Sequence, residues 1–251
     1  MTDDNGNGCS SFCGRSASFY GDFHRESSTA AASFDCAKAS SPVEKMICSD
    51  SAVSNLDKEL HRSYRQALAA AINPSLIKED QRGWLLDHRD RCTIVQCLRE
   101  AYESRIKELR ALASRGRISP SPSQPFEHLK MYQGLHPSSV LDDRIVGPAI
   151  KALVGRHFAL LSADLAGPST GAVIRDSGDF EGDACAPHAC SVAEAKVYLT
   201  QGGSIYIAIL DGGDKVLYFS NDPPYKKKIF PALKAFIDVR SSPAKISYLS
   251  Q

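Results

Sequence analysis

The sequence predicts an α-helical N-terminal domain joined to an α+β C-terminal domain, in which helices cover an antiparallel sheet of about five strands. A length of 251 residues is enough for one or two domains. Residues 36–115 have apolar side chains at three- and four-residue steps, which is typical of amphipathic helices. Residues 155–220 instead contain short runs rich in Val, Ile and Tyr between Gly and Asp, which is typical of strands.

Four helices are expected in the N-terminal domain, which we place at residues 35–115. Their expected starts are near Ser41, Ser51, Ser75 and Thr93. The first has a capping-box pattern, with Ser41 before the helix, Pro42 at its first position and Glu44 two residues later. Asn73-Pro74 should end the second helix, because proline disfavours helix in the residue before it. Antiparallel helices joined by short turns are the expected result.

The C-terminal domain is expected over residues 139–251. A helix over Val140–Val154, interrupted near Gly147-Pro148, precedes the strands, and a helix over Tyr225–Val239 follows them. The strand candidates are His157–Leu165, Gly171–Asp176, Ala195–Thr200, Ser204–Leu210 and Lys215–Ser220. Asp211-Gly212-Gly213-Asp214 predicts a hairpin turn between the last two strands, since glycine tolerates positive φ.

Two segments are expected to lie outside these domains. Ile118–Gln124 alternates Pro and Ser, which favours extended chain, so residues 116–138 are expected to be a linker. Residues 1–34 are polar and are expected to be a disordered leader, without the apolar stretch of a signal peptide. Ala30-Ala31-Ala32 nevertheless resembles the small-residue end of one, which a misassigned start would explain; a disordered cytosolic leader is the alternative.

The composition excludes several classes of protein. There are 30 Lys and Arg against 29 Asp and Glu, so the bulk charge gives no reason to expect nucleic acid as a partner. The apolar share of 43% is enough for a hydrophobic core. No run of 18 apolar residues is present, so no membrane span is expected.

The cysteines indicate the compartment. There are 8, and no two form a C-x-x-C motif, whereas two pairs have C-x4-C spacing, which suits a small disulfide-closed loop. We therefore expect disulfides rather than metal or redox chemistry, and a periplasmic or secreted protein. The candidates are Cys36, Cys48, Cys92, Cys97, Cys185 and Cys190. The first four allow three pairings, and Cys9 and Cys13 lie in the leader.

The tightest cluster of reactive side chains is Cys185-Ala186-Pro187-His188-Ala189-Cys190. A disulfide between its ends would hold His188 at a rigid tip, where an imidazole could probe a cleft that contains carboxylates. The alternatives are a structural turn with an exposed histidine and a zinc site, which is disfavoured because the cluster supplies only three ligands. No metal or cofactor is expected. Because G-x-S-x-G and other catalytic constellations are absent, we do not expect an enzyme.

This cluster resembles the loop of the inhibitor of vertebrate lysozyme (Ivy) family, C-K-P-H-D-C. Cys185, Pro187, His188 and Cys190 match that motif, whereas alanines replace its two polar residues. A strand before the loop and a hairpin after it are also similar, over roughly residues 150–240. The resemblance implies that the loop enters a lysozyme cleft, with His188 at the catalytic acids. It favours a c-type lysozyme as partner and allows a homodimer.

The first half resembles the LprI-like domain of bacterial lysozyme inhibitors. The matching positions lie over residues 35–112 and include the four cysteines of that half, Gln81, Trp84, Arg89-Asp90, Tyr102 and Arg105. The resemblance implies a periplasmic or lipid-anchored helical module, although no cysteine is placed for lipidation after a signal segment. Trp84 is expected in the core, and Arg89 with Asp90 on a solvated or ion-paired face.

Together these patterns predict an exported bacterial inhibitor of lysozyme that occludes the glycosidase cleft with the loop carrying His188. The alternative hypothesis is a non-inhibitory binding module of the cell envelope, or an immunity protein against another toxin.

Overall fold

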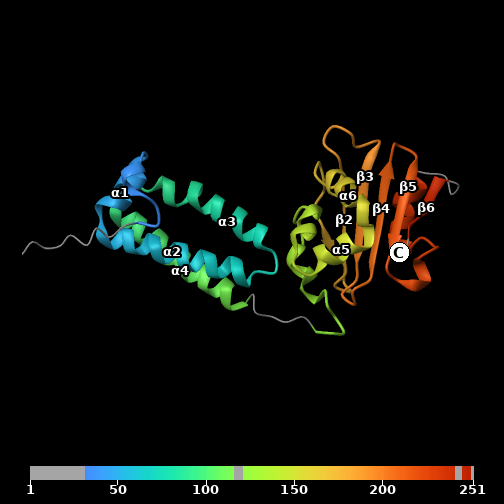
Figure 1. Ribbon diagram of the computed structural model, residues 1–251, viewed down its shortest axis with the longest axis horizontal. Helices are drawn as coiled ribbons and strands as arrows, with labels where there is room; N and C mark the ends of the chain where they lie inside the picture. Colours follow the sequence, from blue (N-terminus) through green and yellow to red (C-terminus); the bar gives the residue numbers. More distant parts are fainter. Residues whose placement is uncertain (1–31, 116–120, 241–244, 250–251) are drawn as a thin grey trace, which may run out of the picture.

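The computed structural model describes residues 32–115, 121–240 and 245–249. It contains a helical unit followed by an α+β unit, as the sequence predicts (Figure 1). Most of the expected leader, including Cys9 and Cys13, lies outside the described residues. Ala32 and Ser33, at its end, belong to the helical unit: Ala32 is buried, and the Ser33 N–H donates to the carboxylate of Asp57.

The helical unit has the four helices expected. Its elements are η1 (Cys36–Lys38), α1 (Pro42–Ser49), α2 (Ser51–Ala70), α3 (Pro74–Asp87), η2 (Arg89–Arg91) and α4 (Val95–Arg115). The core is formed by the apolar faces of these helices, where Trp84 packs edge-on against Tyr102 at 5.5 Å between ring centres. The placement of Trp84 in the core is therefore confirmed.

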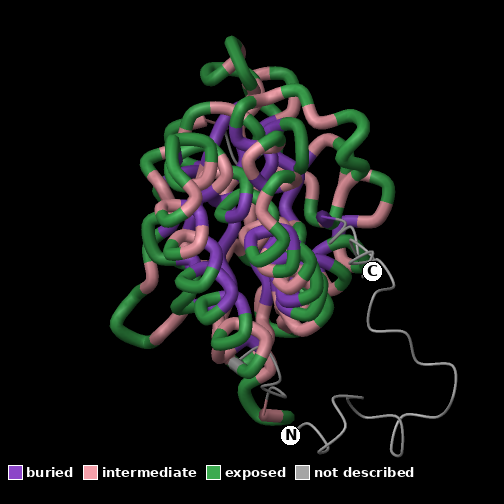
Figure 2. Tube along the Cα trace, turned by 90° about the vertical axis from the view of Figure 1, so that its left-hand side faces the viewer, coloured by how far each residue is buried: buried purple, intermediate pink, exposed green. Residues whose placement is uncertain are grey.

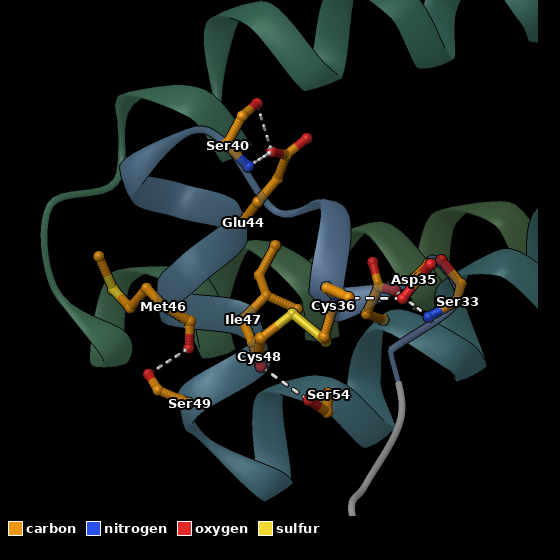
Figure 3. Close-up of a disulfide and its surroundings, with 12 residues drawn as sticks. Ser33, Asp35, Cys36, Ser40, Glu44, Met46, Ile47, Cys48, Ser49 and Ser54 are labelled. Atoms are coloured by element: carbon orange, nitrogen blue, oxygen red, sulfur yellow. Dashed lines mark hydrogen bonds between the residues drawn. A yellow bond between two sulfur atoms is a disulfide. The ribbon is translucent and has the colours of Figure 1, made fainter.

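The start of α1 is fixed by its capping box and by a disulfide. Glu44 N–H donates to Ser41 Oγ at 3.1 Å, and Ser41 N–H donates back to Glu44 Oε2 at 3.0 Å. These backbone donors lower the pKa of Glu44 to about 2. The disulfide from Cys36 to Cys48 ties η1 to the end of α1 (Figure 3).

The α+β unit begins with short helices and ends with a sheet and one further helix. Its helical elements are η3 (Glu127–Tyr132), η4 (Pro137–Asp142), α5 (Val146–Val154), η5 (Gly155–His157), α6 (Phe158–Asp164), η6 (Pro223–Tyr225) and α7 (Pro231–Asp238). Its strands are β1 (Val173–Ile174), β2 (Phe180–Cys185), β3 (Ala193–Leu199), β4 (Ile205–Asp211), β5 (Lys215–Ser220) and β6 (Ile246–Tyr248).

The strands form one six-stranded sheet in the order β1-β2-β3-β4-β5-β6. Strands β1 to β5 pair with one another in antiparallel fashion, whereas β6 pairs in parallel with β5, Val216 opposite Ile246. The sheet is thus mixed and has one strand more than expected. Three residues of the C-terminal segment form this edge strand, a length too short for an alternating pattern to reveal it.

Both faces of the sheet are covered, because β4 and its neighbours are apolar on both sides. Ile205, Ile207 and Ile209 face a core shared with α5 and α6, whereas Tyr206, Ala208 and Leu210 face α7. Buried residues accordingly follow the inner faces of the helices and the middle of the sheet, and exposed residues surround them (Figure 2). The result is a three-layer arrangement, with α7 on the face of the sheet opposite α5 and α6.

The expected strand over His157–Leu165 is wrong. The segment is the helix α6 preceded by the last residue of η5, and its buried Leu161 and Leu165 recur at a four-residue step. In a short apolar run, helix and strand periods are hard to distinguish. The other strand candidates are confirmed with shifted ends, and so is the strand before the 185–190 loop.

The helix expected over Val140–Val154 is interrupted earlier than Gly147-Pro148. Asp143 separates η4 from α5, and its Oδ1 accepts hydrogen bonds from the backbone N–H groups of Ile145 and Val146, both at 2.8 Å. Pro148 lies in the first turn of α5, where a helix tolerates proline because the N–H would have no partner there. The carboxylate therefore sets the break.

The expected linker over residues 116–138 is shorter in the structure. Residues 116–120 lie outside the described part, but Phe126, Leu129 and Tyr132 are buried in the core of the α+β unit. Phe126 N–H also donates to the carbonyl of Gln201 at 3.1 Å. Apolar side chains at three-residue steps thus anchor the chain soon after its Pro/Ser stretch.

The two units touch where α2 ends. The Arg144 guanidinium donates to the carbonyls of Ala69 at 2.7 Å and Leu68 at 3.0 Å, and Arg144 N–H donates to the carbonyl of Ile72 at 2.9 Å. The carbonyls of Leu68 and Ala69, in the last turn of α2, have no partner within the helix, so the Arg144 guanidinium completes its C-terminus.

A buried polar network continues this contact. Asn73 Nδ2 donates to the Tyr132 hydroxyl at 3.2 Å, and that hydroxyl donates to Asp143 Oδ2 at 2.5 Å. Burial opposes ionisation of Asp143, but hydrogen bonds from His128 and Tyr132, together with those from the backbone N–H groups of Val146 and Ile145, outweigh it and lower the pKa of the carboxyl. None of the helices that the structure describes is long and apolar enough to cross a membrane.

Candidate functional site: the 185–190 loop

The loop that the sequence singles out connects β2 to β3. Cys185 is the last residue of β2, and a disulfide joins it to Cys190. Cys185 is buried at the base, whereas Pro187 and His188 are exposed. The structure therefore brings the four motif residues together, with the imidazole on the surface.

The tip of the loop is a tight turn. Ala189 N–H donates to the carbonyl of Ala186 at 3.1 Å, which places Pro187 and His188 at the two central positions. His188 has a φ of 62°, in the left-handed region. Proline first and a positive φ second are the features of a type II turn, which normally takes glycine at that second position.

His188 is the only residue other than glycine with positive φ in the described part of the chain. Such a conformation costs free energy for a residue with a Cβ and occurs preferentially at functional sites. A merely structural turn would be served better by glycine, since glycine has no such cost.

A segment of the chain after α6 supports the base of the loop, and we call residues 165–169 the strap. Gly167 N–H donates to the carbonyl of Cys185 at 2.9 Å, and the Pro168 carbonyl accepts from Cys185 N–H at 3.4 Å. Ser169 Oγ donates to the carbonyl of Asp183 at 2.6 Å. The strap thus follows the last residues of β2 into the loop.

Gly167 permits this approach. A Cβ on Gly167 would lie 2.3 Å from the carbonyl oxygen of Cys185 and 2.8 Å from the backbone nitrogen of Pro187. All of these neighbours are backbone atoms, so no side chain can rotate away. Only glycine lets the strap touch the loop so closely.

His136 holds the strap from its other side. Its Nε2 lies 2.8 Å from the carbonyl oxygen of Gly167, which can only accept, so Nε2 carries the proton. Its Nδ1 accepts from the backbone N–H of Ser138 at 3.3 Å. A chain of contacts therefore leads from η4 through His136 and Gly167 to the loop.

The opposite side of the loop base rests on the β4–β5 turn. Gly213 N–H donates to the carbonyl of Val192 at 3.1 Å, and Ala186 N–H donates to the carbonyl of Ala193 at 2.8 Å. Val192 is 47% exposed, so an apolar side chain accompanies the imidazole on the same connection. This surface offers one titratable group and one apolar contact to a partner.

A buried carboxyl group directly precedes the strap in the chain. Asp164, the last residue of α6, is 1% exposed, and its Oδ2 has no hydrogen-bond partner among the described residues. Burial, and the nearby carboxylate of Asp211, raise the pKa of Asp164 to about 6.

Gly167, His136 and Asp164 were not predicted as site residues. The sequence Gly167-Pro168 indicates a turn, but nothing local shows that this turn supports a loop formed later in the chain.

The zinc-site alternative requires free cysteine thiolates. Because Cys185 and Cys190 form a disulfide, they are not available as zinc ligands. Among the residues described, no group of three or more His, Cys, Asp or Glu side chains could hold a metal ion.

The helical unit carries the other two disulfides, Cys36–Cys48 and Cys92–Cys97. This pairing is one of the three that the sequence allows. Arg89 forms an ion pair with Asp90 at 2.7 Å, which agrees with the expected ion-paired face.

In comparison with known proteins, each unit matches a family model. Residues 36–109 match the model of the family "Lysozyme inhibitor LprI", and residues 146–238 match the family "Inhibitor of vertebrate lysozyme (Ivy)". Similar curated proteins are "Lipoprotein LprI" of Mycobacterium bovis and of Mycobacterium tuberculosis, each 34% identical over 98 residues. That alignment covers 38% of this chain and 48% of each relative, so the chain spans about half the length of the relatives it matches.

No solved structure shows a significant match to the chain. The helical unit thus matches one family of lysozyme inhibitors, and the α+β unit with the 185–190 loop matches a second.

Proposed function

We propose that the protein inhibits lysozyme-type glycosidases by inserting the 185–190 loop into their catalytic cleft. The matches of both units to lysozyme-inhibitor families support this function. The observation that carries the loop mechanism is the backbone of His188, a left-handed residue with a large side chain at an exposed tip. An inhibitor rather than an enzyme is the role that we assign.

The imidazole suits such a cleft chemically. Glycosidases place two carboxyl groups across the scissile bond, one protonated and one ionised. A neutral imidazole has one donor and one acceptor nitrogen, so His188 can donate to the ionised carboxylate and accept from the protonated one. As a cation it would pair with the ionised group.

The support of the loop suits tight binding. The disulfide, the strap and the β4–β5 turn hold the base of the loop before a partner arrives. Little conformational entropy is then lost on binding, which favours affinity. Val192 would add an apolar contact beside the imidazole. A c-type lysozyme is the partner that we favour.

We also propose a periplasmic or secreted location. Three disulfides among the described residues are typical of an oxidising compartment. The lysozymes that both families inhibit act on the cell wall, outside the cytoplasm, which is consistent with that location.

Lysis of peptidoglycan by a c-type lysozyme, titrated with the full-length protein, tests the mechanism. His188→Ala should weaken inhibition by roughly 30-fold or more, the effect of removing a central interface residue. His88→Ala is the matched control, because His88 is an exposed histidine between α3 and η2, and it should inhibit like the wild type. Thermal unfolding should be the same for both variants.

Full inhibition by His188→Ala would mean that the inhibitory surface lies outside the loop. The helical unit would then be the next candidate. Failure of the wild-type protein to inhibit c-, g- and i-type lysozymes would contradict the proposed function. The alternative, a non-inhibitory binding module of the cell envelope or an immunity protein, would then hold.

A further inference from the structure

Four basic side chains lie side by side on the exposed surface of α2. Lys58, His61, Arg62 and Arg65 are all exposed and are spaced by three or four residues, so they share one face of the helix. We call them the basic face. At a rise of about 1.5 Å per residue they extend over roughly 10 Å. With Gln66 and Ala69 they line a shallow hollow of about 490 Å³.

The basic face is not neutralised by the described part of the protein. Arg99, in the same unit, is by contrast paired with Asp50 at 3.0 Å. Within residues 32–115, 121–240 and 245–249, no ion pair or hydrogen bond engages the side chains of the basic face. The acidic residues beside it are used elsewhere: Glu59 pairs with Arg110 on α4, and Asp57 is buried and accepts from Tyr102.

Unpaired like charges in a row repel one another, and a bound anion relieves that repulsion. Two of the four are arginines, whose planar guanidinium groups bind phosphate with two parallel hydrogen bonds. A row of cations in a hollow therefore matches an anion whose charges repeat along a line.

The surroundings favour a linear polymer over a lipid bilayer. A helix that lies on a membrane buries large apolar side chains beside its basic ones. None of the exposed large apolar residues in the described chain belongs to α2. The attraction is thus electrostatic only, as in the binding of a soluble polyanion.

We propose that the basic face of α2 binds a linear, phosphate-bearing polyanion. This surface lies in the helical unit, whereas the proposed lysozyme-binding loop lies in the α+β unit. The two proposals therefore rest on different residues and fail separately.

Binding of the full-length protein to long-chain inorganic polyphosphate, measured at 50 and 200 mM salt, tests this proposal. Three cations that replace counterions of a flexible polyanion give an affinity that falls by roughly 20-fold over this interval. The variant Lys58→Gln/Arg62→Gln/Arg65→Gln should bind roughly tenfold or more weakly at 50 mM salt, with a flatter salt dependence.

The matched control is Lys45→Gln/Lys78→Gln/Arg82→Gln. It removes the same charge from exposed cations on α1 and α3 that make no ion pair among the described residues, and it should bind nearly as the wild type. Equal losses in both variants would mean that net charge alone attracts the polymer, which overturns the proposal.

Absence of salt-sensitive binding at 50 mM would overturn the proposal as well. So would binding confined to vesicles that contain anionic lipid, because the partner would then be a membrane. Equal thermal unfolding of the two variants excludes misfolding as the cause of a difference.

Discussion

His188 holds a backbone conformation that its side chain disfavours, and its neighbours maintain it. Pro187 presets the first half of the turn, and the disulfide from Cys185 to Cys190 closes it. Left-handed non-glycine residues cost on the order of 1 kcal/mol or more. The turn would be more stable with glycine at position 188, but glycine would not provide an imidazole there.

Asp164 is a second residue that lowers stability near the site. Its pKa is raised to about 6, so the folded state binds a proton that the unfolded carboxyl, with its ordinary pKa near 3.8, has lost at that pH. The destabilisation is absent below pH 4, grows between pH 4 and pH 6, and is complete above that range. Stability therefore falls as the pH rises through this window.

Replacing Asp164 by Asn should remove this cost. We expect Asp164→Asn to raise the free energy of unfolding by about 2 kcal/mol at pH 7, and to change it much less at pH 4. Denaturant titration at both pH values measures this difference. Asp176→Asn, at an exposed position, is the control. A gain of equal size at both pH values would show that the titration of Asp164 is not its cause.

At the scale of elements, the strap sets the position of the loop. Gly167→Ala would place a Cβ against the backbone of Cys185 and Pro187, so the loop must shift. We expect inhibition of lysozyme to weaken roughly tenfold, since a displaced central residue loses its contacts. The measurement is the same lysis titration, with the 185–190 disulfide verified by mass spectrometry.

Gly83→Ala serves as the comparison for this variant. Gly83 lies within α3, and a Cβ there meets no atom within 4 Å, so inhibition should be unchanged. If Gly167→Ala inhibits like the wild type, the strap does not position the loop.

Elements whose signals lie within a few residues were predictable from the sequence. The capping box of Ser41 and Glu44 and the closure of the 185–190 loop involve partners that are close in the chain. The helix within His157–Leu165 could not be predicted in this way, because a short apolar run fits a strand or a buried helix equally well. Packing against the sheet decides between them.

The support of the site could not be predicted in the same way. His136 and Gly167 act on a loop formed by residues that come later in the chain, through contacts that only the folded unit creates. Phe126 and Leu129 were assigned to the linker for the same reason, since their burial depends on the sheet. Sequence patterns identified the tip of the loop and missed what holds it.

At the scale of the whole molecule, the oxidation state of the cysteines tests the proposed periplasmic or secreted location. If the protein is exported, Cys36, Cys48, Cys92, Cys97, Cys185 and Cys190 should resist alkylation in protein taken from its native compartment. Electrophoresis with and without reductant, followed by mass mapping of alkylated cysteines, measures this. Free thiols at all six positions would contradict a periplasmic or secreted location.

Arg144 joins the two units at the end of α2, where the carbonyl groups have no hydrogen-bond partners within the helix. Turning one unit against the other would break its two hydrogen bonds to the end of α2 and its third to Ile72. It would also disturb Asn73, which bonds to Tyr132 in the next unit. In solution the described part of the chain should therefore tumble as a single body, with one rotational correlation time. If an enzyme is bound by the loop, the helical unit should therefore keep a fixed orientation relative to that enzyme and should not move independently of it.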